Sequence, residues 1–163
     1  MNATFDTFPT AFGAFSIAVN ADGDLLGTAF GDVRTLQLRI PAYHLSQDAG
    51  RGRDAREQVL AFFAGKRRTF QLPMAEIGTA FQRRVWAELG RIPFSETRTY
   101  GGIAAAIGQP RAARAVGRAN ALNPVCLIVP CHRVIGANGA LTGFAFGAPL
   151  KQRLLDHERA FPM

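Results

Sequence analysis

The start of the chain carries the hydrophobic pattern of β-strands. Residues 12–19 mix aromatic and β-branched side chains, and residues 25–30 form a candidate partner strand after the turn signal Asp22-Gly23. Residues 36–40, which end just before a proline, are a third candidate strand. Together these segments predict a small antiparallel sheet in the N-terminal part.

A helix and a short strand are expected after this sheet. Residues 53–64 have the spacing of a helix that stops at a glycine, and residues 69–72 have a strand-like composition. The prolines and glycines near residues 73–78 mark a boundary. We therefore expect one domain over residues 1-74 and a second over residues 78-163.

The second half of the chain carries the spacing of short helices. Thr79 and Gln82 form the sequence signature of a capping box, so a helix is expected to begin there. Residues 100–107 and 111–122 predict two further helices around a turn that contains Gly108. Two short helices around such a turn, the second rich in Arg and Ala, are typical of a helix-turn-helix.

The last third contains one apolar run and one final helix. Residues 125–129 predict a buried strand, and residues 151–158 predict a helix that turns Leu154 and Leu155 inward. With the N-terminal sheet, these elements predict an α+β protein of two domains.

Composition excludes a membrane protein. The 163 residues are 48% hydrophobic, which is enough for a packed core. The sequence has no run of about 18 apolar residues, so no transmembrane helix is expected. The first ten residues lack the basic start of a secretory signal. We therefore expect a cytoplasmic protein without a membrane partner.

The net charge of +7 comes mostly from arginine. Seven arginines fall between positions 83 and 118, where only Glu88 and Glu96 oppose them. Because Arg binds phosphate with two parallel hydrogen bonds, this segment is a candidate nucleic-acid surface, with an ordinary solvated surface as the alternative. The second predicted helix has alanines where base-reading Asn or Gln would be expected, which favours sequence-independent binding over transcription-factor readout.

The stretch Pro130-Cys131-His132-Arg133-Val134 carries candidate chemistry. Thiolate is a nucleophile, and a neighbouring imidazole helps to form it near neutral pH. Cys126 lies five residues from Cys131, and in a strand an odd separation places side chains on opposite faces, so no disulfide is expected. The two cysteines and His132 also lack the spacing of a zinc site, so we expect no metal there.

These residues, taken together, resemble the O6-alkylguanine-DNA alkyltransferase family. The match runs in order from about residue 78 to residue 158, while the first half agrees only in size and pattern. The motifs that carry it are Gly78 to Trp86, Tyr100 to Ala104, Ile107 to Pro110, Arg114 to Asn120, Asn123-Pro124, Pro130 to Gly136, and Lys151-x-x-Leu154-Leu155-x-x-Glu158. The resemblance implies a ribonuclease H-like N-terminal sheet with a helix, and a C-terminal helical domain with a winged-helix-like helix-turn-helix.

The function implied by the resemblance is direct DNA repair. The protein would flip the damaged base out of duplex DNA and move the alkyl group, chiefly methyl, from O6 of guanine to its own Cys131. The transfer would be irreversible, would happen once, and would need no cofactor; O4-alkylthymine is a second candidate substrate. The partner would be double-stranded DNA that contains O6-alkylguanine, bound by a monomer that can cluster on DNA.

The resemblance also assigns catalytic roles. Cys131 would accept the alkyl group, and His132 with Glu158 would lower the pKa of its thiol through a water molecule. Tyr100 would help to rotate the target nucleotide and would donate a proton to the leaving guanine.

Further residues are assigned to DNA, to the pocket and to support. Arg114 would enter the duplex from the minor groove and fill the vacated place. The expected DNA-binding set is Ala113, Arg114, Ala115, Gly117 and Asn123. The expected substrate pocket is Tyr100, Val134, Phe144, Ala145 and Phe146. Asn123 would link the recognition helix to the acceptor strand, and Arg133 would brace the site by hydrogen bonding.

The loop after the acceptor motif departs from the family pattern. It is Gly143-Phe144-Ala145-Phe146-Gly147 here, where the family usually shows Gly-Tyr-x-Gly-Gly. Phe146 replaces a small residue, which predicts poor acceptance of bulky O6 groups such as benzyl; stacking on aromatic adducts is the opposite possibility. The altered loop also leaves open a non-catalytic binder of alkylated DNA, which the presence of Cys131 disfavours. A Cys-His hydrolase or acyltransferase is a further alternative, and it would need an oxyanion hole.

Overall fold

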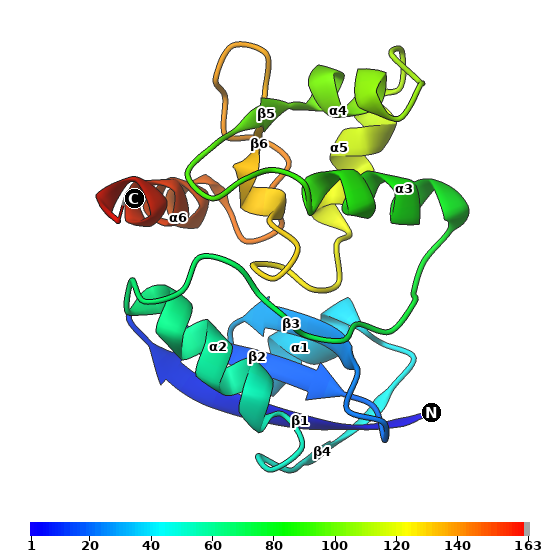
Figure 1. The fold of residues 1–163 in the computed structure, drawn as a ribbon. Helices are drawn as coiled ribbons and strands as arrows, with labels where there is room; N and C mark the ends of the chain where they lie inside the picture. Colours follow the sequence, from blue (N-terminus) through cyan, green and yellow to red (C-terminus); the bar gives the residue numbers. More distant parts are fainter. Residues whose placement is uncertain (162–163) are drawn as a thin grey trace. The chain divides into compact units, whose positions relative to one another are not determined.

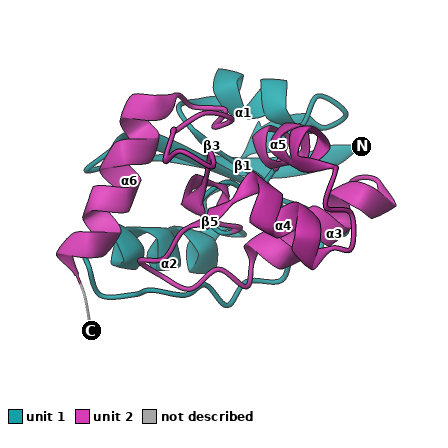
Figure 2. Ribbon diagram, turned by 90° about the horizontal axis from the view of Figure 1, so that it is seen from above, with its two compact units in different colours: residues 1–76, 124–128 teal, residues 77–123, 129–163 magenta. Residues whose placement is uncertain are grey.

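The computed structural model describes residues 1–161, and the chain divides into two compact units (Figure 2). Unit 1 comprises Met1–Glu76 and Pro124–Ile128, and unit 2 comprises Ile77–Asn123 and the described residues from Val129 onward. The assignment of residues 124–128 to unit 1 is not foreseen by the sequence pattern. Positions 162 and 163 of the expected second domain lie outside the described residues.

Unit 1 is built on a four-stranded sheet with the order β3-β2-β1-β4 (Figure 1). The strands are β1 (Asn2–Thr10), β2 (Gly13–Val19), β3 (Leu25–Phe30) and β4 (His44–Gln47). β2 pairs antiparallel with both β1 and β3, whereas β4 runs parallel to β1. The expectation of a purely antiparallel sheet is therefore wrong at the β4 edge, which the hydrophobic pattern did not identify as a strand.

One segment expected to be a strand is a helix. Residues of the predicted third strand belong to α1 (Val33–Arg39), whose N-cap Asp32 accepts hydrogen bonds from the backbone of Arg34 and Thr35. The cap satisfies backbone donors at the helix start, and this local effect outweighs the apolar alternation that suggested a strand. The helix predicted over residues 53–64 is confirmed as α2 (Arg53–Phe63), but residues 69–72 form no strand.

The apolar run 125–129 is not a strand either. Val125 forms an isolated parallel bridge with Thr28, whose hydroxyl donates to the Cys126 carbonyl at 2.7 Å. Leu127 then adopts a φ of 73°, which turns the chain away from any extended course. Cys126 and Cys131 therefore do not lie on one strand, contrary to expectation, although both described cysteines are buried and form no disulfide.

Unit 2 consists mainly of short helices, as the pattern predicts. They are α3 (Ala80–Leu89), α4 (Tyr100–Ala106), α5 (Ala113–Ala121) and α6 (Ala148–Ala160), with a 3₁₀ turn over Cys131–Arg133 and a parallel pair β5 (Arg98–Thr99) and β6 (Val134–Ile135). The capping box of Thr79 and Gln82 is confirmed at the start of α3. None of the helices in residues 1–161 is long and apolar enough to cross a membrane.

The capping box gives the first prediction. Thr79→Ala removes the oxygen that accepts from the Gln82 backbone at 3.1 Å, and we expect this to cost about 1 kcal/mol of unfolding free energy. Thermal unfolding followed by circular dichroism should show a lower Tm for Thr79→Ala and a nearly unchanged Tm for Thr79→Ser, which keeps the hydroxyl. Equal melting of wild type and Thr79→Ala would contradict a stabilising cap.

Candidate functional site

The acceptor candidate Cys131 lies in a constrained turn of unit 2. It begins the 3₁₀ turn after Pro130, and its side chain is buried. Its backbone N–H donates to the Val129 carbonyl at 2.8 Å, and its carbonyl accepts from Asn120 Nδ2 at 3.2 Å. The backbone that carries the thiol is therefore held at both ends of the residue.

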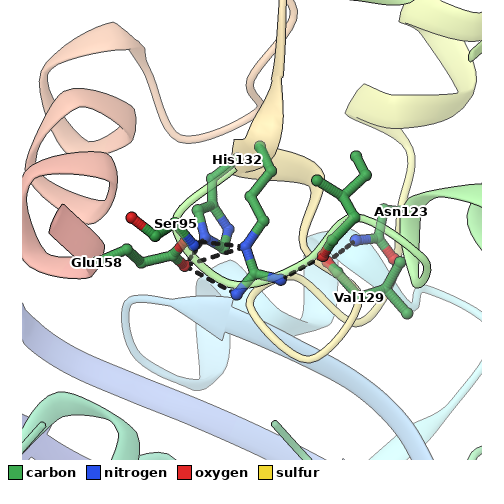
Figure 3. Close-up of polar contacts among 7 residues, drawn as sticks. Ser95, Asn123, Val129, His132 and Glu158 are labelled. Atoms are coloured by element: carbon green, nitrogen blue, oxygen red, sulfur yellow. Dashed lines mark hydrogen bonds and ion pairs between the residues drawn. The ribbon is translucent and has the colours of Figure 1, made fainter. Parts of the chain in front are cut away.

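His132 and Glu158 form a fully buried pair (Figure 3). His132 Nε2 lies 2.6 Å from Glu158 Oε2, and neither side chain has any exposed surface. Burial lowers the pKa of His132 and outweighs the opposing effect of Glu158. Among the described residues, His132 Nδ1 has no hydrogen-bond partner, so this nitrogen is available to take a proton.

Glu158 also accepts hydrogen bonds from Arg133 and from a backbone N–H. Arg133 donates through Nε at 2.9 Å and through Nη2 at 3.0 Å, and its Nη1 donates to the Ile92 carbonyl at 2.8 Å. The Ser95 N–H donates to Glu158 Oε1 at 2.9 Å from a backbone with φ of 70° (Figure 3). Burial raises the pKa of Glu158, but the bonds from His132 and Arg133 outweigh it and lower that pKa to about 2. The carboxylate therefore stays charged in the interior.

Tyr100 and Lys151 form a second cluster. The half-buried Tyr100 hydroxyl donates to the Thr142 carbonyl, and Lys151 Nζ donates to the same carbonyl at 3.1 Å and to the Tyr100 oxygen at 3.4 Å. Burial raises the pKa of Tyr100 to about 12, and negative charge on Cys131 adds to the rise. Burial lowers the pKa of Lys151 to about 8, against the effect of Cys131. Both groups therefore respond electrostatically to charge on Cys131.

Lys151 and Asn120 are two residues of the site that the sequence analysis assigned no role. Lys151 has no exposed surface, and its spacing to Leu154, Leu155 and Glu158 places all four on one helical face. A lysine at the same helical spacing as the inward-facing leucines is the sequence signal that could have identified Lys151. Asn120 joins two segments, because its Nδ2 donates to the carbonyls of Cys131 and Gly143. Nothing in the sequence pattern distinguishes it from an ordinary helix-end asparagine.

The supporting and pocket residues fall into two groups. Asn123 is buried after α5, and its Nδ2 donates to the Val129 carbonyl at 2.9 Å (Figure 3).

Phe144 is buried and meets the half-buried Phe146 edge-on, with ring centroids 5.7 Å apart. The Lys151 ammonium lies 6.0 Å from the Phe144 ring and 5.7 Å from the Tyr100 ring. The structure thus groups Tyr100 with Phe144 and Phe146, while Ala145 is exposed and Val134 is buried in β6.

Helix α5 carries the other DNA-binding candidates, and a Cβ built on its Gly117 would lie 3.8 Å from the Tyr100 ring. Arg114 and Ala115 are exposed, and Ala113 and Gly117 are half-buried. Unit 2 contains 11 of the 19 basic residues and 4 of the 12 acidic residues, so the whole net charge of +7 falls in this unit. Over residues 1–161, no group of three His, Cys, Asp or Glu side chains is arranged to hold a metal ion.

Comparison with known sequences places these residues in a wider context. Residues 80–160 match the family model described as 6-O-methylguanine DNA methyltransferase, DNA binding domain. The methylated-DNA--protein-cysteine methyltransferase of Methanosarcina acetivorans is 56% identical over 106 residues, which cover 65% of this chain and 68% of the relative. The protein of the same name from Mycobacterium bovis is 50% identical over 117 residues, which cover 72% and 71%.

Solved structures extend the similarity to both units. Mycobacterium tuberculosis OGT in complex with DNA superposes with a TM-score of 0.87 at 40% identity, covering 97% of this chain and 94% of that chain. The Mycobacterium tuberculosis O6-methylguanine methyltransferase superposes with a TM-score of 0.86 at 39% identity, covering 99% and 95%.

The buried carboxylate gives a prediction about acid stability. The pKa of Glu158 in the folded chain, about 2, lies below its ordinary value of 4.5, so the stabilisation is complete above that value and is lost as the pH falls toward 2. Glu158→Gln leaves the Arg133 charge without its buried partner and should cost about 3 kcal/mol at pH 7. Urea unfolding measured across this pH range should show that the unfolding free energy of the variant falls less steeply with falling pH than that of the wild type.

Asp156→Asn is the matched control, because that carboxylate is exposed on the same helix. It should reproduce the wild-type curve. A Glu158→Gln protein with wild-type stability at pH 7 would show that the buried charges do not hold the site together.

Proposed function

Because this chain belongs to the 6-O-methylguanine DNA methyltransferase family, we propose that it repairs alkylated DNA directly, with Cys131 as the alkyl acceptor. The activity is that of a methylated-DNA--protein-cysteine methyltransferase. The observation that carries the assignment to Cys131 is its position beside the buried pair of His132 and Glu158.

Activation of the thiol uses the free side of the His132 ring. Because burial disfavours the charged imidazolium, His132 is neutral at rest and can accept a proton. Nδ1 takes the Cys131 thiol proton, directly or through one water, while the charged Glu158 stabilises the resulting imidazolium through Nε2. The arrangement resembles a catalytic triad in its logic, with Arg133 fixing the carboxylate.

The transfer step is a displacement at the alkyl carbon. The Cys131 thiolate attacks this carbon, a sulfur–carbon bond forms, and the bond between the carbon and guanine O6 breaks. The electron pair passes to guanine, which takes up one proton and is restored. The product on the protein is a thioether, which is stable, so each molecule reacts once.

Tyr100 and Lys151 supply the proton for the leaving guanine. The Tyr100 hydroxyl is a weak acid, with a pKa raised to about 12, and cannot readily lose its proton without replacement. Lys151 donates to the same oxygen and has a pKa lowered to about 8, so it can return a proton as Tyr100 gives one up. This pairing gives the buried lysine a role in protonating the guanine.

Binding of DNA belongs to α5. The target atom lies inside the base stack, so the base has to be flipped out, at a cost of a few kcal/mol. Arg114 enters the vacated place, and the small residues Ala113, Ala115 and Gly117 let the helix approach the minor groove closely. The whole positive net charge falls in unit 2, which supports binding of DNA by this unit, since phosphate contacts dominate affinity for DNA.

The proposal includes finer features of fold and setting. We assign unit 1 a ribonuclease H-like arrangement, supported by its antiparallel β1–β3 core with β4 added in parallel. We assign α4 and α5 a winged helix-turn-helix, supported by the short β5–β6 pair. The partner is duplex DNA carrying O6-alkylguanine, met in the cytoplasm by a monomer that can cluster on DNA. O4-alkylthymine is a second candidate substrate.

Intact-mass measurement tests the reaction. Incubation with a duplex that contains one O6-methylguanine should add one methyl group, about 14 Da, to the protein, and peptide mapping should place it on Cys131. Cys131→Ser should gain no mass while still binding the duplex, and Cys126→Ser is the matched control that should react normally. Binding without any mass change in the wild type would instead indicate a non-catalytic lesion binder.

The aromatic loop gives a prediction about substrate size. Phe146 lies against Phe144, which in turn lies near Lys151 and the Tyr100 cluster, so its ring reduces the space around the alkyl group. Wild type should transfer benzyl from O6-benzylguanine in duplex DNA at least about 10-fold more slowly than methyl, given that small changes in placement cost this much. Phe146→Gly should reduce the difference between the methyl and benzyl transfer rates. Benzyl transfer as fast as methyl transfer in the wild type would show that the ring does not exclude the larger group.

A further inference from the structure

Helix α3 donates two side-chain hydrogen bonds to the helix-turn-helix. Arg84 Nη2 donates to the carbonyl of Ile107, which is the C-cap of α4. Trp86 Nε1 donates to the carbonyl of Ala119 in the last turn of α5 at 2.8 Å. Carbonyls in the last turn of a helix carry partial negative charge and have acceptor capacity left over, so both are favourable acceptors, although the Ala119 carbonyl also accepts from the Leu122 N–H at 3.2 Å. One short helix therefore holds the C-terminal ends of both neighbours.

The indole ring of Trp86 is fixed from its other side. Gly78 has a φ of 94°, and a Cβ built there would lie 2.7 Å from two ring atoms of Trp86. The ring thus packs directly against backbone at the entry to α3. The position of its N–H, and with it the position of Ala119, is set by the start of α3.

Ala119 precedes the residue that bonds α5 to the 3₁₀ turn Cys131–Arg133, called here the acceptor turn. The next residue, Asn120, donates to the Cys131 carbonyl, and Asn123 donates to the Val129 carbonyl two residues before Cys131. The N-terminal part of the same helix carries Arg114 on its exposed face. A shift at Ala119 would therefore change the placement of the DNA-contacting face relative to Cys131.

We propose that Trp86 and Arg84 are positioning residues that keep α5 aligned with the acceptor turn, so that a base flipped from bound DNA arrives at Cys131. This inference rests on the proposed function. Neither residue touches the reacting atoms, so their loss should slow transfer from DNA and leave the intrinsic reactivity of the Cys131 thiol unchanged.

Two single-turnover rates separate these effects. One is methyl transfer from saturating duplex with one O6-methylguanine, and the other is alkylation of Cys131 by iodoacetamide without DNA. Trp86→Phe keeps an aromatic ring but removes the N–H, and it should slow the DNA reaction at least about 10-fold while iodoacetamide alkylation stays within about twofold. Arg84→Gln should act in the same direction, and Arg84→Lys, which keeps a cationic donor, should recover most of the rate.

Arg51→Gln is the matched control, because it removes one positive charge from an exposed side chain of unit 1 that pairs with Asp48, outside the arginine-rich segment 83–118. It should leave both rates within about twofold. Equal changes of the two rates in Trp86→Phe and Arg84→Gln, or no change in either rate, would overturn the inference. If wild type itself transfers no methyl group to Cys131, the proposed function fails instead.

Discussion

The buried carboxylate of Glu158 is the charge on which the rest of the site depends. A charge without exposure is tolerated only where partners replace its hydration, and here His132, Arg133 and the Ser95 N–H do so. These partners come from the acceptor turn and from the loop before β5, whereas Glu158 comes from α6. The need to satisfy one carboxylate therefore brings three separate segments of unit 2 together around Cys131.

The bond to Glu158 also determines which nitrogen of His132 can accept a proton. With Nε2 of His132 committed to Glu158, only Nδ1 remains to accept a proton, and burial keeps the ring neutral until it does. On the guanine side, Lys151 is buried without a carboxylate partner in its cluster, and its pKa of about 8 reflects that cost. In the proposed mechanism, His132 is the proton acceptor for the thiol, and Lys151 is the proton donor behind Tyr100. Separating the two tasks would allow the thiol to lose a proton while guanine gains one.

Local signals predicted much of unit 2, and tertiary effects account for most of what they missed. The capping box, the two short helices and the Cys-His pair each depend on neighbours within a few residues, so the sequence displays them directly. The strand expected at residues 36–40 is mostly helix α1, which Asp32 caps, and that capping aspartate is visible in the sequence. The run 125–129 could not be distinguished from a strand, because its apolar side chains are largely buried although the run belongs to no strand of the sheet. The contacts of Lys151 and Asn120 form only when segments distant in the sequence come together, and the same holds for the hydrogen bond that Trp86 donates to Ala119.

In the proposed mechanism, the pair of His132 and Glu158 makes Cys131 a thiolate near neutral pH. The direct measurement is the pH dependence of the rate at which iodoacetamide alkylates Cys131, compared between two proteins that both carry Cys126→Ser, one with Glu158 intact and one with Glu158→Gln. This mechanism predicts rapid alkylation already at pH 7 with Glu158 intact, and a rate profile displaced to higher pH when the carboxylate is neutralised. Coincident profiles for the two proteins, both rising only at alkaline pH, would contradict it.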